Sequence, residues 1–358
     1  MIGYLAEASG APCPTLVLDA EGLPRADHLL RPLLTEVRRQ LVRDGHQNTL
    51  KIALISASPH PLFDLDYRFV QCLPESLDAV DFHGSCGHSI VASVLVAGAR
   101  RLVARPAPGD RVRLRVLNNG DHIVCEVDES RRGSGSFTLH LVQQPGTALS
   151  SVLMTGRPLD RVTAAGAEYD VSLVSLGNPY VFVDAQDLGL HTRAALFGAG
   201  REVFEEMQGI RRAASAMLEM DPAGVFPKVA AVGSYEQNRL SARAISVPSW
   251  HPTLALTGTT CLATAATVPG TVPGRLHRGT AQDSARIEID TAGGRAVAEV
   301  RSDHQQPEAL LQWVSVRRKQ ARLLSGPFAI GPDAPLTDLV VHPYDTAEEA
   351  TSWTPLTV

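Results

Sequence analysis

The fold of this chain is decided by a stretch that occurs twice. It is Pro14-Thr-Leu-Val-Leu-Asp-Ala20, and it recurs 165 positions later as Pro179-Tyr-Val-Phe-Val-Asp-Ala185. Each copy is a short apolar run that ends in a polar turn, which predicts a buried strand followed by a loop. Self-similarity at so long a spacing indicates a duplicated structural unit rather than a local motif.

Three further pairs of segments follow in the same order and at nearly the same spacing. They are Leu50-Lys-Ile-Ala-Leu-Ile55 with Pro227-Lys-Val-Ala-Ala-Val232, Ser85-Cys-Gly-His-Ser89 with Thr257-Gly-Thr-Thr260, and Leu114-Arg-Val-Leu-Asn-Asn-Gly120 with Ile287-Glu-Ile-Asp-Thr-Ala-Gly293. Their offsets are 177, about 172 and 173 residues. Four ordered matches at a nearly constant offset predict that the chain consists of two related halves.

Each half is predicted to be a curled sheet around one central helix. Apolar residues at helical spacing predict amphipathic helices over Ala26–Arg43 and Glu202–Met220, and a further helix over Pro307–Leu324. Short β-prone runs predict strands, among them Ile52–Ile55 and Arg111–Val116. Because strands outnumber helices, we predict the α+β class, with two similar domains.

The domain boundaries are placed from composition. The stretch Thr155–Ala167 contains glycines and a proline and is predicted to be the linker. The first domain is then expected at residues 1–157 and the second at residues 158–342. Residues 343–358 form a C-terminal segment that we expect to pack back on the first domain.

Composition and charge limit the class of protein. Hydrophobic residues make up 44% of the 358 residues and charged residues 20%, which is typical of a globular chain. A net charge of −5 without a basic block argues against nucleic acid as a partner. The longest nearly apolar run, Ser89 to Ala99, is too short for a membrane span. With no export signal at the start, the five cysteines are expected to be reduced thiols, and the protein cytoplasmic.

Cys86 is the first candidate catalytic residue. The turn Gly84-Ser-Cys-Gly87 leads directly into an apolar helical stretch, so the thiol is expected at a helix N-terminus. Free amide groups and the helix dipole favour a thiolate there and can hold a substrate carboxylate. A thiol in this position can act as a proton-transfer base or as a nucleophile. The alternative is a small buried hydrophobic residue without a chemical role.

Lys51 is the second candidate, because it interrupts an apolar strand. Only three of the 33 basic residues are lysines, and Lys51 and Lys228 fall at matched positions of the two halves. Matched positions favour anion binding or proton transfer for at least one of them. The alternative is an edge strand that places the side chain in water.

Other residues near these segments have two interpretations each. Asn178 lies in an Asn-Pro turn, and its amide could fix a carboxylate. His83 and His88 flank Cys86 and either tune the thiol or lie at the surface. Neither a zinc-binding spacing nor a Gly-rich nucleotide-binding signature occurs, so we expect no metal and no cofactor.

The chain resembles the 2-methylaconitate cis-trans isomerase (PrpF-like) family, whose relatives include diaminopimelate epimerase. The segments that carry the resemblance are spread over roughly residues 10 to 340, and they include Gly84-Ser-Cys-Gly-His88, Pro227-Lys-Val-Ala230, Ala242-Arg-Ala-Ile-Ser-Val-Pro248 and Ala265-Ala-Thr-Val-Pro-Gly-Thr-Val272. The resemblance implies two similar domains, each a β-sheet or barrel around a central helix. It also implies an active site in the cleft between the domains.

The resemblance assigns roles to individual residues. Cys86 matches the family's catalytic cysteine and Lys51 its catalytic lysine. The positions matched to carboxylate-binding turns are Gly87, His88 and Ser89 in the first half, and Thr257, Gly258 and Thr259 in the second. Ser85, where the family usually has Asn, and Asn178 are further candidates for substrate binding. The epimerases carry a second cysteine where this chain has Ala255, so a reaction with one catalytic thiol is favoured.

One segment departs from the family. An Arg-Gly-Gly-Thr-Ser-Lys loop that usually contributes to the substrate site is replaced by Glu7-Ala-Ser-Gly-Ala-Pro-Cys-Pro14, which contains neither Arg nor Lys. Each desolvated carboxylate needs a charged or multi-donor partner, so this loop argues against a tricarboxylate. A substrate with fewer carboxylates is expected.

The resulting hypothesis is a cofactor-independent isomerase that shifts a proton across an allylic system of a small unsaturated carboxylate. Either Cys86 or Lys51 removes the proton, and the other group returns one. Two alternatives stay open: a tautomerase or epimerase on a related acid, and a non-catalytic member of the family that binds a small acid or a partner. A homodimer is also left open.

Overall fold

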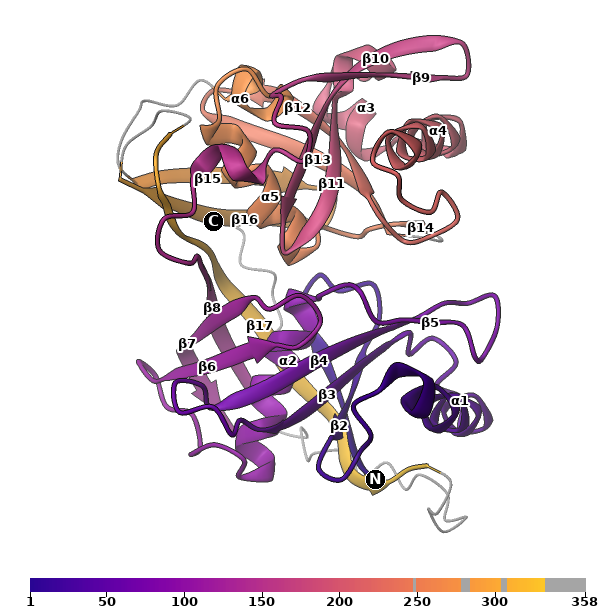
Figure 1. Ribbon diagram of the computed structural model, residues 1–358, viewed down its shortest axis with the longest axis vertical. Coiled ribbons are helices and arrows are strands. Elements are labelled where there is room, and N and C mark those ends of the chain that lie inside the picture. Colours follow the sequence, from indigo (N-terminus) through magenta and orange to yellow (C-terminus); the bar gives the residue numbers. More distant parts are fainter. Residues whose placement is uncertain (247–248, 278–283, 304–307, 332–358) are drawn as a thin grey trace. The chain divides into compact units, whose positions relative to one another are not determined.

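The computed structural model describes residues 1–246, 249–277, 284–303 and 308–331. The chain divides into two units (Figure 1): unit 1 is Met1–His140 together with the chain from Arg318 onward, and unit 2 is Leu141–Arg317. The sequence placed the boundaries at 157 and 342 instead. Residues 343–358, which were expected to pack on the first domain, lie outside the described residues.

Unit 1 is a closed barrel of eight strands. The barrel strands pair in the order β1, β2, β3, β4, β6, β7, β8, β17, and β17 returns to β1. Their bounds, with the short β5 that pairs with β4, are β1 Ile2–Ala8, β2 Thr15–Asp19, β3 Lys51–Ala57, β4 Leu65–Cys72, β5 Val80–Asp81, β6 Arg111–Val116, β7 His122–Arg131, β8 Ser134–Val142 and β17 Leu311–Ala329.

Unit 2 repeats this pairing order. Its strands are β9 Asp160–Ala164, β10 Ala167–Leu176, β11 Asn178–Asp184, β12 Lys228–Glu236, β13 Arg239–Ser246, β14 Ser249–Trp250, β15 Ser284–Thr291 and β16 Gly294–Ser302. The pairs β11–β12 and β13–β15 are parallel, as are β2–β3 and β4–β6, and the pairs between them are antiparallel in both units. The predicted duplication and the α+β class are therefore confirmed.

The helices also occur as matched pairs. They are α1 Asp27–Arg43, α2 Gly87–Arg100, α3 Arg193–Phe197, α4 Arg201–Met217, α5 Leu256–Thr267 and α6 Val272–Leu276, with 3₁₀ turns at Leu149–Val152 and Ala185–Leu188. Amphipathic α1 and α4 bury one face against the sheet of their own unit. In α2, 10 of 14 residues are buried, and in α5, 10 of 12. A helix buried on nearly all sides is the core of its unit, which identifies α2 and α5 as the two central helices.

The predicted helix over Pro307–Leu324 is wrong, because this part of the chain forms strand β17. Its buried apolar residues alternate, with Val314 and Val316 in the first part and Ala321 and Leu323 in the second, and Ser315 between the first two is also buried. Between the two parts Arg318 adopts a left-handed φ of 51°, which breaks the alternation. Two strand segments out of phase produced the apparent helical spacing.

The predicted linker at Thr155–Ala167 is also replaced by regular structure. Strand β9 lies inside this stretch and pairs with β10 in an antiparallel ladder from Ala167–Ala164 to Val171–Asp160. Glycine supplies the tight turn of this hairpin, since Gly166 has a φ of 83°. The glycine and proline content marked a hairpin rather than a domain boundary.

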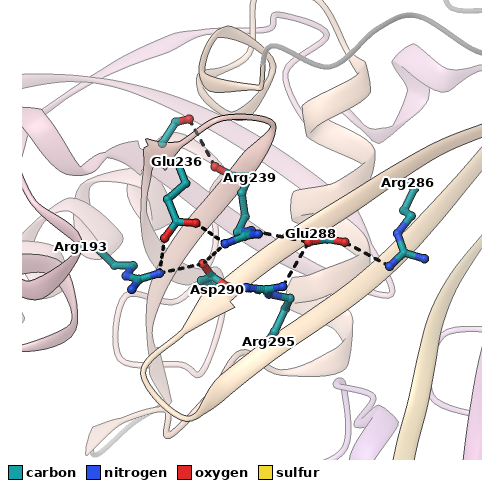
Figure 2. Close-up of polar contacts among 8 residues, drawn as sticks. Arg193, Glu236, Arg239, Arg286, Glu288, Asp290 and Arg295 are labelled. Carbon is teal, nitrogen blue, oxygen red and sulfur yellow. Dashed lines mark hydrogen bonds and ion pairs between the residues drawn. The ribbon is translucent and has the colours of Figure 1, made fainter. Parts of the chain in front are cut away.

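A network of charged side chains joins α3, the β12–β13 hairpin and the β15–β16 hairpin of unit 2 (Figure 2). Its members are Arg193, Glu236, Arg239, Arg286, Glu288, Asp290 and Arg295. At its centre the Asp290 carboxylate accepts from Arg295 Nε at 2.9 Å and from Arg193 Nη1 at 3.3 Å. Asp290 is largely buried, and its ion pairs connect the ends of the strands around the parallel pair β13–β15.

Candidate active site

Cys86 is the residue from which helix α2 starts, as the sequence predicted. It is the N-cap, with an extended backbone at φ −139°, and its carbonyl accepts the Ile90 amide at 3.0 Å. The residue is 9% exposed. A thiol in this position lies at the positive end of the helix dipole, where the thiolate form is favoured.

Lys51 is buried, which excludes the edge-strand alternative. It opens strand β3, which pairs with β2 on one side and β4 on the other, opposite Thr15 and Gln71. The residue as a whole is only 5% exposed. Within the described residues, its ammonium group has no carboxylate in ion-pair contact. A buried cation without a counter-charge costs stability, so its presence favours a chemical role.

Two hydroxyl groups connect the lysine strand to the cysteine helix. The Oγ atoms of Thr15 and Ser89 lie 2.9 Å apart, within hydrogen-bond distance. Thr15 is the ladder neighbour of Lys51, and Ser89 lies in the first turn of α2, three residues after Cys86. Lys51 and the start of α2 therefore belong to one local cluster inside unit 1.

Tyr67 also belongs to this cluster, although the sequence did not indicate it. Its hydroxyl donates to the Cys86 carbonyl at 3.2 Å from strand β4. Burial raises the pKa of Tyr67 well above its ordinary value of 10, and the nearby Cys86 raises it further. Tyr67 is therefore a neutral hydrogen-bond donor that fixes the start of α2. It sits in an ordinary apolar strand, so no motif could have identified it.

Cys13 is the second residue that sequence reasoning did not assign to the site. It lies in the loop between β1 and β2, two residues before Thr15. Burial raises the pKa of its thiol, the charge of Lys51 lowers it, and Cys86 raises it again. Cys13, Lys51 and Cys86 therefore interact electrostatically. The 165-residue offset between the two halves could have indicated Cys13, because this offset matches it with the candidate Asn178.

The remaining candidates near Cys86 divide into buried and exposed residues. Ser85, Gly87, His88 and Ser89 are all buried around the helix start. The His83 side chain is 86% exposed and lies 3.6 Å from the Asp81 carboxylate. Of the two flanking histidines, only His88 is therefore in the cluster.

In unit 2 the matching candidates surround the start of α5. Ala255 is the N-cap of this helix, the position that Cys86 holds in α2. Asn178 Nδ2 donates to Thr257 Oγ1 at 3.1 Å, and Thr259 Oγ1 donates to the Ala255 carbonyl at 3.2 Å. A side chain at Gly258 would collide with Tyr180, since a Cβ there would lie 2.7 Å from Tyr180 Cζ. The start of α5 thus carries amide and hydroxyl groups but no thiol.

Lys228 matches Lys51 in the ladder but not in its surroundings. It pairs with Tyr180 across β11 and β12, as Lys51 pairs with Thr15. Its Nζ lies 5.7 Å from the centroid of the Phe226 ring, and the residue is only partly buried. The two lysines are equivalent by register and different by environment.

Two classes of feature are not found in the part of the chain that the structure covers. Among the described residues, no group of three or more His, Cys, Asp or Glu side chains could hold a metal ion. None of the described helices is long and apolar enough to cross a membrane.

Known proteins share both the sequence pattern and the fold of this chain. It is 28% identical over 281 residues to the 3-methylitaconate isomerase of Eubacterium barkeri, covering 67% of this chain and 73% of that protein. It is 22% identical over 338 residues to the 4-oxalomesaconate tautomerase of Pseudomonas putida, covering 88% and 91%. The crystal structure of a methylitaconate-delta-isomerase superimposes with a TM-score of 0.61 at 22% identity, covering 90% and 95%.

The duplicated barrel-like units with buried central helices, together with these relatives, define the protein as an isomerase. The family model described as PrpF protein matches residues 42–330, which is most of the chain. The chain belongs to the PrpF family, as the sequence resemblance predicted. The names of these two relatives are those of enzymes that act on 3-methylitaconate and 4-oxalomesaconate.

Proposed function

We propose that this isomerase shifts a proton across an allylic system next to a carboxylate, with Cys86 and Lys51 as its acid–base groups and without a cofactor. The observation that carries the proposal is the cluster in unit 1. It joins a thiol at the start of a buried helix to a buried lysine through Ser89 and Thr15. A nearby ammonium group and a helix N-terminus both favour the thiolate that such a reaction needs.

In this proposal Cys86 removes the proton and Lys51 supports the return of one. A carboxylate of the substrate lies against the first turn of α2, at Gly87, His88 and Ser89. The amides of a helix N-terminus stabilise the carboxylate and the enolate charge that develops as the proton leaves. General acid–base catalysis typically supplies about 10²- to 10⁴-fold, so the electrostatic contribution of the helix must add to it.

We also propose that the start of α5, taken within unit 2 by itself, is a carboxylate-binding turn. Asn178 and Thr257 are already hydrogen-bonded to each other, which orients both toward the helix start. Thr259 is buried, and Gly258 keeps the backbone free of a side chain. Neutral amide and hydroxyl donors of this kind suit a carboxylate.

We further propose that the substrate is a dicarboxylate of the methylitaconate type rather than a tricarboxylate. The segment Glu7–Pro14 contains no Arg or Lys, and Pro12 and Pro14 have no amide proton to donate. In choosing this substrate we follow the relative named 3-methylitaconate isomerase rather than the relative named 4-oxalomesaconate tautomerase.

The test is solvent deuterium incorporation, followed by NMR, with the protein in D₂O and one acid at a time. The acids are 3-methylitaconate, the tricarboxylate 2-methylaconitate, and the monocarboxylate crotonate. We expect fastest exchange with 3-methylitaconate. Fastest exchange with 2-methylaconitate contradicts the argument from the loop, and exchange with none of a wider panel of unsaturated acids contradicts the isomerase proposal.

A further inference from the structure

In both units, the first residues of the matched strand, β2 or β11, contact the start of the central helix. In unit 2, Asn178 donates to Thr257 at 3.1 Å, and Tyr180 packs on Gly258. In unit 1, Thr15, the match of Tyr180, contacts Ser89 at 2.9 Å. The residue matched with Asn178 is Cys13, so the duplication places its thiol at the start of α2.

The surroundings of Cys13 agree with this placement. Its thiol is affected by the charges of Lys51 and Cys86, and by a backbone hydrogen bond at Leu50, directly before the lysine. Pro12 and Pro14 fix the backbone on both sides of it. Cys13 is also more exposed than the other cysteines, since Cys72, Cys125 and Cys261 are 0% exposed.

We propose that Cys13 is a further acid–base group of this site, beside Cys86 and Lys51, so that two thiols of unit 1 exchange protons with the two ends of the allylic system. The inference rests on the proposed function, and it adds a residue that the family resemblance does not supply. A reaction with one thiol was expected because Ala255, at the start of α5, replaces the second cysteine of the epimerases. The second thiol here comes from the same unit as the first.

The proton transfers balance without an added reactant. The Cys86 thiolate takes the allylic proton, so a C–H bond breaks, an S–H bond forms, and the electron pair enters the dienolate. Cys13 then gives its thiol proton to the far carbon, which forms the new C–H bond and leaves a thiolate. Lys51 resets the pair by donating a proton to Cys13 and accepting one from Cys86.

The first experiment follows the substrate's own hydrogen. With 3-methylitaconate in D₂O, two separate thiols give a product that carries solvent deuterium at the newly protonated carbon from the first turnover. We expect this for wild type and for the control Cys125→Ala. In Cys13→Ala and Cys13→Ser we expect turnover to fall at least tenfold, with the residual product retaining substrate hydrogen. Retention of substrate hydrogen by wild type, or an unchanged rate and label in both Cys13 variants, overturns the proposal.

The second experiment needs no substrate, so it separates this inference from the proposed function. Iodoacetamide alkylation of Cys13 is measured by mass spectrometry as a function of pH. Because interacting groups titrate together, Cys86→Ala should shift the Cys13 profile to lower pH and Lys51→Met to higher pH. Identical profiles in all variants overturn the thiol pair whatever the activity is. Shifted profiles without exchange on any acid overturn the proposed function instead.

Discussion

Lys51 and Lys228 occupy matched positions in different surroundings. Lys51 is 5% exposed inside the thiol cluster, whereas Lys228 is partly buried beside Phe226. We expect Lys51→Met to lower kcat by about 10²-fold or more, because it removes one of the two proposed acid–base groups. The same change should raise the melting temperature, because it removes a buried charge that has no carboxylate partner among the described residues.

The matched control for this prediction is Lys228→Met, which should change kcat little. Initial rates of deuterium exchange and thermal unfolding curves measure both effects. Equal losses of activity in the two variants would show that both lysines serve the chemistry. Unchanged kinetics with lower stability in Lys51→Met would assign that lysine a structural role.

At the residue scale, the sequence revealed the groups whose neighbours are unusual. Cys86 stands between glycines before an apolar helix, and Lys51 interrupts an apolar strand. Tyr67 and Cys13 have no such local signature, because their importance comes from contacts across the barrel. Such contacts depend on strand register, which no local pattern records.

At the element scale, β17 carries the lysine that remains after Lys51 and Lys228. Lys319 directly follows the left-handed Arg318, and the next residue, Gln320, accepts a hydrogen bond from the Ser9 amide at 2.9 Å. Burial lowers the pKa of Lys319 to about 8. The altered loop thus has a lysine near it in space, and burial makes the ammonium group of this lysine easier to deprotonate.

This pKa predicts a pH-dependent stability effect. The unfolded lysine keeps its proton up to about pH 10.5, whereas the folded one loses it near pH 8. The unfolded chain therefore binds more protons between these values, and stability rises with pH through this window. We expect Lys319→Met to raise the free energy of unfolding most below pH 8, with the gain disappearing above pH 10.5.

Urea unfolding of Lys319→Met and wild type at pH 7, 9 and 10.5 measures this difference. Lys228→Met is the control, because it replaces a lysine on a different strand, β12. A gain of the same size at every pH would assign the effect to apolar packing rather than to the charge.

The same strand marks the limit of sequence reasoning about elements. Its two parts pair in different units, Val316 with Ala298 in unit 2 and Ala321 with Ala8 in unit 1. Local periodicity identified α1 and α4 because each has one apolar face that meets one sheet. β17 has two partners and a break between them, so its period could not be read from neighbouring residues.

At the scale of the whole molecule, the duplication made the fold predictable. Each pairing of unit 1 from β1 to β7 has its counterpart in unit 2, with the same parallel and antiparallel order. The units differ in chemistry. Cys86 is matched by Ala255 at the helix start, and Tyr67, opposite Ile55, is matched by Ala242, opposite Val232. At the start of the central helix, unit 1 has a thiol and unit 2 has neutral amide and hydroxyl groups.

The central claim is that Cys86, at the start of α2, transfers the proton. It is tested most directly by the initial rate of solvent deuterium exchange into 3-methylitaconate, compared between wild type and Cys86→Ser, with Cys125→Ser as the control. A hydroxyl gives up its proton far less readily than a thiol, so exchange should fall by about 10²-fold or more, with an unchanged melting temperature. Near-normal exchange by Cys86→Ser would contradict the account and move the base to Lys51 or Cys13.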